Sequence, residues 1–227
     1  MFEHVISVVT QALPKLCTGM ALTIQMTLFG VIIAFIIGLI ACLARISRFK
    51  IFSAVSGAYI YIIRGTPMLV QAFFLYFGVA QLLPFKLSKN LVGIITISLN
   101  AGAYMAEIFR GSIQSISKGQ MEAARSLGLP YGTAMRKVIL PQALRRSIPS
   151  LTNQVIISLK DVSILSAIGV AEIFQAGKII TARNMESTII WTTVGAIYLI
   201  VVFLLTKLAN YVERRTSYGQ STNKKSS

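Results

Sequence analysis

Long apolar runs, separated by short polar and basic segments, dominate the chain. The first run begins after Lys15 and holds no charged residue until Arg45. A helix needs about 20 apolar residues to cross the hydrocarbon core of a bilayer. On this criterion the sequence predicts five membrane-spanning helices. They cover residues 19–43, 51–83, 91–109, 147–171 and 187–206.

Charged residues interrupt two of the predicted spans, and polar or amphipathic segments flank the membrane domain at both ends. Charged residues interrupt the second span at Arg64 and the fourth span at Lys160 and Asp161. Apolar residues in the first 15 positions recur with helical spacing, which predicts an amphipathic helix on the membrane surface. The polar stretch 213–227 is expected to be disordered. The transmembrane domain therefore covers residues 16–212.

Composition supports a membrane protein and excludes a nucleic-acid-binding one. The chain of 227 residues is 55% hydrophobic and only 13% charged, whereas a soluble domain is about 25% charged. The net charge of +15 would suggest nucleic-acid binding in a soluble protein. Here the basic residues cluster between apolar runs, which is typical of cytoplasmic loops beside membrane spans. We therefore predict an all-α integral membrane protein with lipid, and not nucleic acid, around it.

The distribution of Lys and Arg predicts the orientation of the spans. If the N-terminus lies outside, 15 of the 22 basic residues fall in cytoplasmic segments, five fall outside and two fall within spans. Cytoplasmic loops carry the excess of Lys and Arg. This bias places the N-terminus outside, the C-terminus in the cytoplasm, and the segment 117–146 between the third and fourth spans in the cytoplasm.

Signals for catalysis or metal binding are absent from the sequence pattern. Cys17, Cys42 and His4 show no metal-ligand spacing. The Gly-Lys pair ending at Lys178 does not fit a phosphate loop, because Ile179 follows it where the motif needs Ser or Thr. We expect no catalytic residue, no metal site and no cofactor in this chain.

The central segment 117–146 is basic, polar and broken by turn residues. Good helix formers precede Gly128, which suits a left-handed residue after a helix, and Pro130 prevents continuation. A compact helix–turn–helix is expected, in which small Ala123 and Ala124 let another surface come close. The plainer interpretation is a solvated loop, but connections of this length tend to be functional.

Two motifs in this segment resemble those of a known family. "EAARSLG" followed after nine residues by "VILP" is similar to the EAA loop of permease subunits of ABC importers. The one departure is Val138, where the family pattern has Ile. "RGTPMLVQAFFLYF" and "YMAEIFRGSIQSISKGQ" resemble the subgroup that imports polar amino acids. The residues assigned to coupling by this resemblance are Glu122, Ala123, Ala124, Leu127, Gly128 and Pro141.

The resemblance implies a multi-subunit machine in the bacterial cytoplasmic membrane. Its permease is non-catalytic, and its EAA loop forms a coupling helix that docks on a separate ATPase dimer, which binds ATP and Mg²⁺. It also implies a second permease subunit, identical or different, and an extracytoplasmic solute-binding protein that delivers a polar amino acid. The alternative is a stand-alone ion-coupled transporter or channel, which does not need such a loop.

Polar residues within two of the spans follow a helical repeat. Positions i, i+4 and i+7 place three of them on one face of the third span and three on one face of the fourth. Such stripes line a solute path or hold the bundle together through interhelical hydrogen bonds, and we favour the path. The residues are Asn100, Tyr104 and Glu107, and Gln154, Ser158 and Asp161.

Charges at membrane depth each cost about 2.5–3.5 kcal/mol on insertion scales and need partners. We assign Arg64 and Lys160 to structural ion pairs. Asp161 is the candidate for binding a substrate ammonium group, although neutralising Lys160 is the competing role. Glu107 lies near the end of its span, where it is either part of the path or an interfacial charge.

Overall fold

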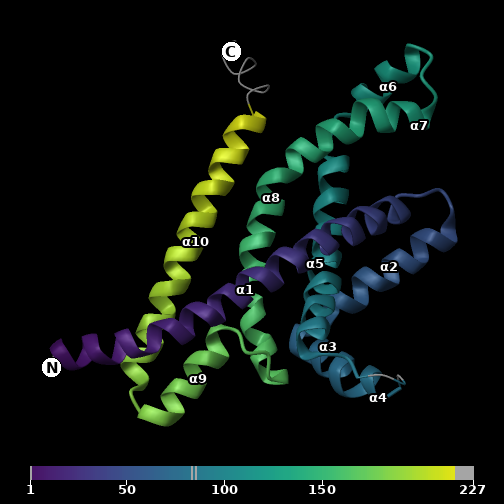
Figure 1. The fold of residues 1–227 in the computed structure, drawn as a ribbon. Helices are drawn as coiled ribbons and strands as arrows, with labels where there is room; N and C mark the ends of the chain where they lie inside the picture. The colour runs from purple at the N-terminus through teal and green to yellow at the C-terminus, as the bar shows by residue number, and fades with distance from the viewer. Residues whose placement is uncertain (1, 83, 85, 218–227) are drawn as a thin grey trace.

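The computed structural model describes residues 2–82, 84 and 86–217, and over these residues all regular secondary structure is helical (Figure 1). Four helical stretches are long and apolar enough to cross a membrane, and a bent helix pair makes up to five. The predicted all-α class is confirmed, and the predicted five spans match the upper count. The four stretches are Phe2–Arg45, Lys89–Gln114, Tyr131–Ile168 and Ser187–Arg215.

The helices follow one another with short connections. Two of them, η1 and η2, are π-helical, and η3 is a 3₁₀ helix. In chain order the elements are α1 (Phe2–Arg45), α2 (Lys50–Gly65), α3 (Met68–Phe73), η1 (Phe74–Val79), α4 (Ala80–Leu82), α5 (Lys89–Gln114), α6 (Lys118–Ser126), α7 (Tyr131–Ala134), η2 (Met135–Ile139), α8 (Leu140–Asp161), η3 (Val162–Ile168), α9 (Ile173–Asn184) and α10 (Ser187–Ser217).

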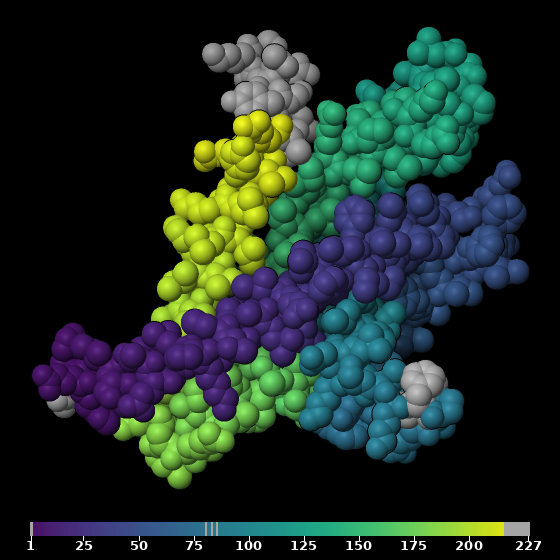
Figure 2. All heavy atoms as spheres, in the orientation of Figure 1, coloured from purple at the N-terminus to yellow at the C-terminus, as the bar shows by residue number. Residues whose placement is uncertain are grey.

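Helix α1 joins two predicted elements into one. Its 44 residues span about 66 Å at 1.5 Å per residue, roughly twice the hydrocarbon thickness. The expected surface helix 1–15 and the expected span 19–43 are therefore continuous, and whether the first part lies on the membrane surface stays a prediction. Helix α1 crosses diagonally over the other helices (Figures 1 and 2).

The predicted second span is two helices instead of one. Helix α2 and the segment Met68–Val79 meet at an angle of 107°. Pro67 has no N–H and forces the preceding residue out of the helical region, and Thr66 is accordingly extended (φ −120°, ψ 143°). The Gln71 side-chain amide donates to the carbonyl oxygens of Ile63 (2.7 Å) and Thr66 (3.0 Å), so the break keeps its backbone hydrogen-bonded.

Helices α1 and α5 pack closely through small residues. A Cβ placed on Gly38 would lie 2.8 Å from the Cβ of Met105 and 2.9 Å from the carbonyl oxygen of Gly102. Only a glycine permits this approach, and small residues at such contacts are typical of membrane helices. The buried cluster around the contact includes Ala34, Ala41, Cys42, Ala101, Met105, Ala106 and Phe109.

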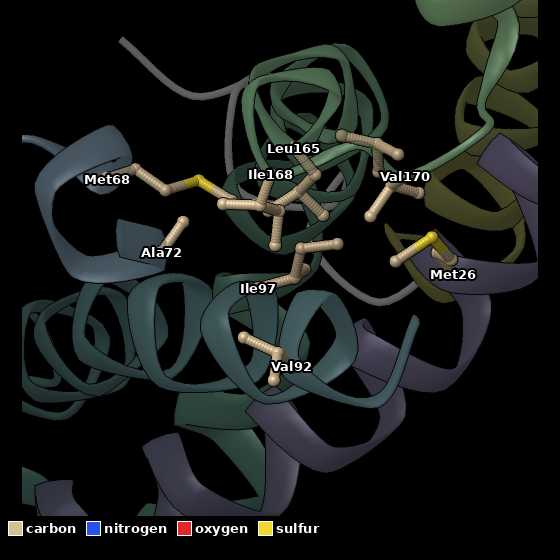
Figure 3. Close-up of a cluster of buried hydrophobic side chains, with 9 residues drawn as sticks. Met26, Met68, Ala72, Val92, Ile97, Leu165, Ile168 and Val170 are labelled. Carbon is tan, nitrogen blue, oxygen red and sulfur yellow. The ribbon is translucent and has the colours of Figure 1, made fainter. Parts of the chain in front are cut away.

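A second buried cluster fixes the broken span against the rest of the bundle (Figure 3). It joins side chains from α1, α3, α5 and η3 in one apolar contact. Because α3 and η3 are packed on the same cluster, the break after α2 and the end of α8 are held next to each other. The cluster consists of Met26, Met68, Ala72, Val92, Ile97, Val162, Leu165, Ile168 and Val170.

Two segments of the C-terminal part add helix beyond the predicted spans. Helix α9 lies between the fourth and fifth predicted spans; the buried Glu172 starts it by accepting the backbone N–H groups of Phe174 and Gln175. Helix α10 continues to Ser217, so residues 213–217 of the expected disordered tail are helical, because no Gly or Pro stops the helix there. The remainder, 218–227, lies outside the described residues.

Candidate functional site

A groove between the broken span, α5 and α8 contains most of the predicted path residues. One hollow of about 500 Å³ is lined by Asn100 and Tyr104 from α5, Gln154 and Asp161 from α8, and Arg64 at the end of α2. We refer to it as the Asp161 hollow. Four predicted path residues and one predicted structural charge are thus brought together.

Two further hollows adjoin the first. The Glu107 hollow, of about 560 Å³, is lined by Arg64, Tyr104, Glu107 and Gln154, among others. The Arg45 hollow, of about 630 Å³, is lined by Arg45, Arg64, Tyr104 and Glu107, among others. Arg64 and Tyr104 line all three, so the three hollows meet at this pair.

Helix α5 presents its polar residues to the groove while its other face packs on α1. Asn100, 8% exposed, donates from its side-chain amide to the Gln71 side-chain oxygen at 3.0 Å. This bond links α5 to the helix after the break. Tyr104 lies one turn further along and is 37% exposed. Gln71 was not predicted as a site residue, although a polar residue within an apolar span was a usable signal.

The Arg64 side chain lies between an aromatic ring and a carboxylate. Its guanidinium carbon is 5.1 Å from the centre of the Tyr104 ring, a distance that gives a cation–π attraction. Its Nη1 is 3.9 Å from Oε2 of Glu107. Glu107 is held more tightly by Arg110, which donates to its two oxygens at 3.0 and 2.6 Å and also to Gln114 at 2.8 Å.

Two predicted site residues, Ser158 and Lys160, take positions that differ from expectation, and Glu107 lies at the far side of the groove. Ser158 is 2% exposed and is not among the residues lining the three hollows, because its side chain faces the packed interior. Glu107 lines the two hollows beyond Arg64 and not the Asp161 hollow. Lys160 is exposed and forms no ion pair with any residue in the described part of the chain.

The segment with the EAA motif folds as a helix with a left-handed end. Helix α6 ends at Ser126, and Gly128 has φ +81°, as predicted. The Gly128 N–H donates to the carbonyl of Arg125 (3.0 Å), and the Leu129 N–H to that of Ala124 (3.2 Å). These two bonds define a Schellman motif. The sharp turn then leads through Pro130 into α7.

Burial divides the motif residues into two groups. Glu122, Ala123 and Leu127 are exposed, and Leu127 reaches 83% exposure. Ala124, expected on a face open to another surface, is 5% exposed, because it faces the rest of the loop. Pro141 lies in the first turn of α8 (Leu140–Asp161), where its missing N–H costs little. Helical structure is continuous from Tyr131 to Ile168, with the π-helical turn η2 directly before α8.

No group of three or more His, Cys, Asp or Glu side chains in the described residues is placed to hold a metal ion. The charged groups of the groove are instead arranged as opposite charges at separate places along it. Such an arrangement can bind and pass a polar solute, since each charge can replace water at one end of the solute.

The comparisons with known proteins agree with this geometry. Residues 30–218 match the family described as "Binding-protein-dependent transport system inner membrane component". The glutamine transport system permease protein GlnP of Escherichia coli (strain K12) is 40% identical over 210 residues, 92% of this chain and 96% of its own length. The arginine transport system permease protein ArtQ of Bacillus subtilis (strain 168) is 36% identical over 207 residues, 89% and 93% of the two chains. The crystal structure of an amino acid ABC transporter with histidines matches with a TM-score of 0.86 at 35% identity, covering 91% of this chain and 96% of that one.

The chain therefore belongs to the family of inner membrane components of binding-protein-dependent transport systems. It is a permease subunit of an ABC importer, and not a stand-alone transporter or channel. The subunit is non-catalytic, and ATP hydrolysis belongs to a separate subunit of the system.

Proposed function

We propose that this permease translocates a polar amino acid through the groove between the broken span, α5 and α8. The observation that carries the proposal is the convergence of Asn100, Tyr104, Gln154 and Asp161 on one hollow of about 500 Å³. An amino acid loses water from its ammonium and carboxylate groups on entering such a space, and polar side chains must replace that water. Asp161 supplies the negative charge for the ammonium group.

Uptake into proteoliposomes tests the substrate class. The vesicles contain the permease with its ATPase, and the binding protein is added outside with labelled L-glutamine or L-arginine, the substrates named for two relatives. We expect ATP-dependent accumulation of at least one polar amino acid. Accumulation of a sugar or an inorganic ion, with no amino acid taken up, would refute the proposal.

The proposed orientation in the bacterial cytoplasmic membrane has the N-terminus outside and the C-terminus inside. It is supported by the excess of Lys and Arg in the predicted cytoplasmic segments, and α6, α7 and the end of α10 lie at the same end of the molecule (Figure 1). With the native cysteines replaced, Cys at position 185 should react with an impermeant maleimide on intact cells. Cys at position 126 should react only after the cells are opened, and the reverse pattern would invert the topology.

We assign α6 and the turn after it as the coupling helix that docks on the ATPase dimer, where ATP and Mg²⁺ bind. Support comes from the exposed apolar side chains at the tip, Leu127 (83% exposed) and Tyr131 (57%), since grouped exposed apolar side chains mark interaction sites and tyrosine is enriched among binding hot spots. Leu127→Asp should reduce co-purification of the ATPase, whereas Met185→Asp, at an equally exposed side chain far from the loop, should not. Unchanged ATPase recovery with Leu127→Asp would contradict the assignment.

A second permease subunit is proposed to close the groove. Arg64 is 42% exposed at its side chain, and Lys160 is exposed within the predicted membrane depth, which is costly in contact with lipid. Native mass spectrometry of the purified complex should show two permease chains, identical or different. A complex with one permease chain and full uptake activity would overturn the pairing.

A further inference from the structure

The meeting point of the three hollows is formed by Arg64 and Tyr104. Along α8, the Asp161 hollow extends toward η3, and the Glu107 hollow extends toward Pro149 at the other end of that helix. A solute that moves along α5 and α8 from one hollow to the other therefore passes residues that line both, and Arg64 is one of them. Tyr104 and Gln154 line both hollows as well, but neither carries a full positive charge.

Arg64 is held at this point, but the hydrogen-bond donors of its guanidinium group are not all used. The distance of 3.9 Å to Glu107 is at the outer limit of an ion pair, and Arg64 donates no side-chain hydrogen bond to another described residue. A guanidinium group has five N–H donors in a planar fork that matches a carboxylate. The Tyr104 ring, 5.1 Å from the guanidinium carbon, attracts the charge without using any of the N–H donors in a hydrogen bond.

The charge balance differs on the two sides of Arg64. The Asp161 hollow is lined by one carboxylate, that of Asp161, together with Arg64. On the other side, Glu107 is shared between Arg64 and Arg110, and Arg45 lines the adjoining hollow. The only carboxylate lining the two hollows beyond Arg64, within the described residues, is already bound by Arg110 at 2.6 Å.

We propose that Arg64 selects substrates by receiving the α-carboxylate of the amino acid at this passage, and that Glu107 is the positioning residue that sets how firmly Arg64 holds it. The inference rests on the proposed transport of an amino acid. In this scheme the ammonium group lies near Asp161 while the carboxylate reaches Arg64. Competition from Glu107 for the guanidinium then allows the carboxylate to leave, because Glu107 offers Arg64 another acceptor.

A purely structural role for the Arg64–Glu107 contact makes different predictions. A structural contact would be formed most strongly at short distance and between buried side chains, yet Glu107 makes its short bonds with Arg110 on its own helix. Arg64 and Glu107 remain 42% and 22% exposed at their side chains. A structural role would also affect the binding of amino acids and of their α-carboxamides equally.

The test measures equilibrium binding to the complete permease–ATPase complex in nanodiscs, without the binding protein, so that only the permease selects. The ligands are L-glutamine and L-arginine, each paired with its α-carboxamide, which lacks the carboxylate charge. Wild type should bind the acid more tightly than the amide by about tenfold or more, as a charged hydrogen bond is worth about 1.5–3 kcal/mol.

The variants separate selection from folding. Arg64→Gln should bring the acid-to-amide affinity ratio close to one, and Arg64→Lys, which keeps the charge but not the fork, should give an intermediate ratio. Glu107→Gln should increase the ratio and lower the maximal uptake rate, and Glu107→Asp should restore both. Arg110→Gln should lower the ratio. Without Arg110, the Glu107 carboxylate interacts with Arg64 alone and competes more strongly with the substrate carboxylate. The control Arg48→Gln removes an arginine stacked on Phe49 at 5.3 Å, outside the three hollows, and should change nothing.

The outcomes distinguish this inference from the proposed function. If wild type takes up an amino acid but binds acid and amide equally, or if Arg64→Gln and Arg64→Lys keep the wild-type ratio, the role of Arg64 is overturned. If Glu107→Gln and Arg110→Gln change binding of acid and amide in parallel, Glu107 is structural. If wild type takes up no amino acid at all, the proposed function itself fails.

Discussion

Helix α5 has two faces that differ in what they tolerate. On one face, Ala101 and Met105 are 2% and 1% exposed and lie against α1, where Gly38 leaves no space for a Cβ. On the other, Asn100 and Tyr104, each one position earlier in the sequence, line a hollow of about 500 Å³. Because successive helical residues point about 100° apart, one helix forms both the scaffold and the groove wall.

The difference shows that side-chain volume limits substitution on the first face, whereas charge and hydrogen-bonding capacity limit it on the second. Added atoms at the α1–α5 contact must displace backbone, since the nearest atoms include a carbonyl oxygen 2.9 Å from a Cβ at position 38. In the groove there is room for added atoms, but the charges and hydrogen-bonding groups have specific partners. On the first face, substitutions that add volume should therefore be the damaging ones. On the second face, substitutions that keep the volume but remove a charge or a hydrogen-bonding group should be.

The largest effect is expected at the scaffold. Gly38→Leu should prevent α1 and α5 from approaching, at a cost above the roughly 1–3 kcal/mol typical of overpacking, because backbone must move. The amount of permease recovered with the ATPase should fall to background. Gly111→Leu, at a glycine of the same helix bundle with no atom within 4 Å of its Cβ position, serves as the control. Normal recovery of Gly38→Leu would show that the contact is not a rigid scaffold.

The next effect is expected in the groove. Asp161→Asn keeps the volume and removes the negative charge, so the subunit should assemble normally while amino-acid uptake falls by about tenfold or more, since a charged hydrogen bond is lost. The measurement is labelled uptake in proteoliposomes across basic and neutral polar amino acids. Glu3→Gln, which neutralises an exposed carboxylate on α1, should transport normally. Wild-type uptake by Asp161→Asn would assign this carboxylate to structure.

The docking loop is a third case, because it lies outside both faces of α5 and should affect coupling to the ATPase instead of assembly or solute binding. Gly128→Val places a β-branched residue at φ +81°, which costs roughly 1–2 kcal/mol or more. The subunit should insert in the membrane, but substrate-stimulated ATPase activity should be lost with the turn. Gly132→Ala, at a glycine with open space and ordinary φ, should keep that activity. Full coupling by Gly128→Val would count against the assignment of the loop.

The smallest effects should separate two neighbours on α8. Gln154 lines the groove, whereas Ser158, 2% exposed, does not. Gln154→Leu should raise the half-saturating concentration for uptake severalfold, because an amide that replaces water around the solute is lost. Ser158→Ala should leave it nearly unchanged. An equal rise of the half-saturating concentration in both variants would mean that α8 presents a different face to the solute path.

Local patterns in the sequence were sufficient for much of the fold. Apolar runs predicted the spans, the charge at Arg64 marked an interruption in the second one, and Gly128 predicted a left-handed helix end that the structure confirms. These features depend on solvent preference and backbone sterics, which act on neighbouring residues. The stripe of Asn100 and Tyr104 on one helix face was predictable for the same reason.

The tertiary structure alone decided how the charges meet. Nothing local indicates that Arg64 lies over the ring of Tyr104, 40 positions away, or that Gln154 lines the groove while Ser158 does not. The burial of Ala124 beside an exposed Leu127 was equally beyond the local pattern. The 107° bend could not be predicted either, because the sequence pattern indicated an interruption of the span but not the direction that the chain takes after it. A proline removes one hydrogen bond, but the direction of the chain after it is set by the apolar cluster that α3 joins with α5 and η3, whose residues are distant in sequence.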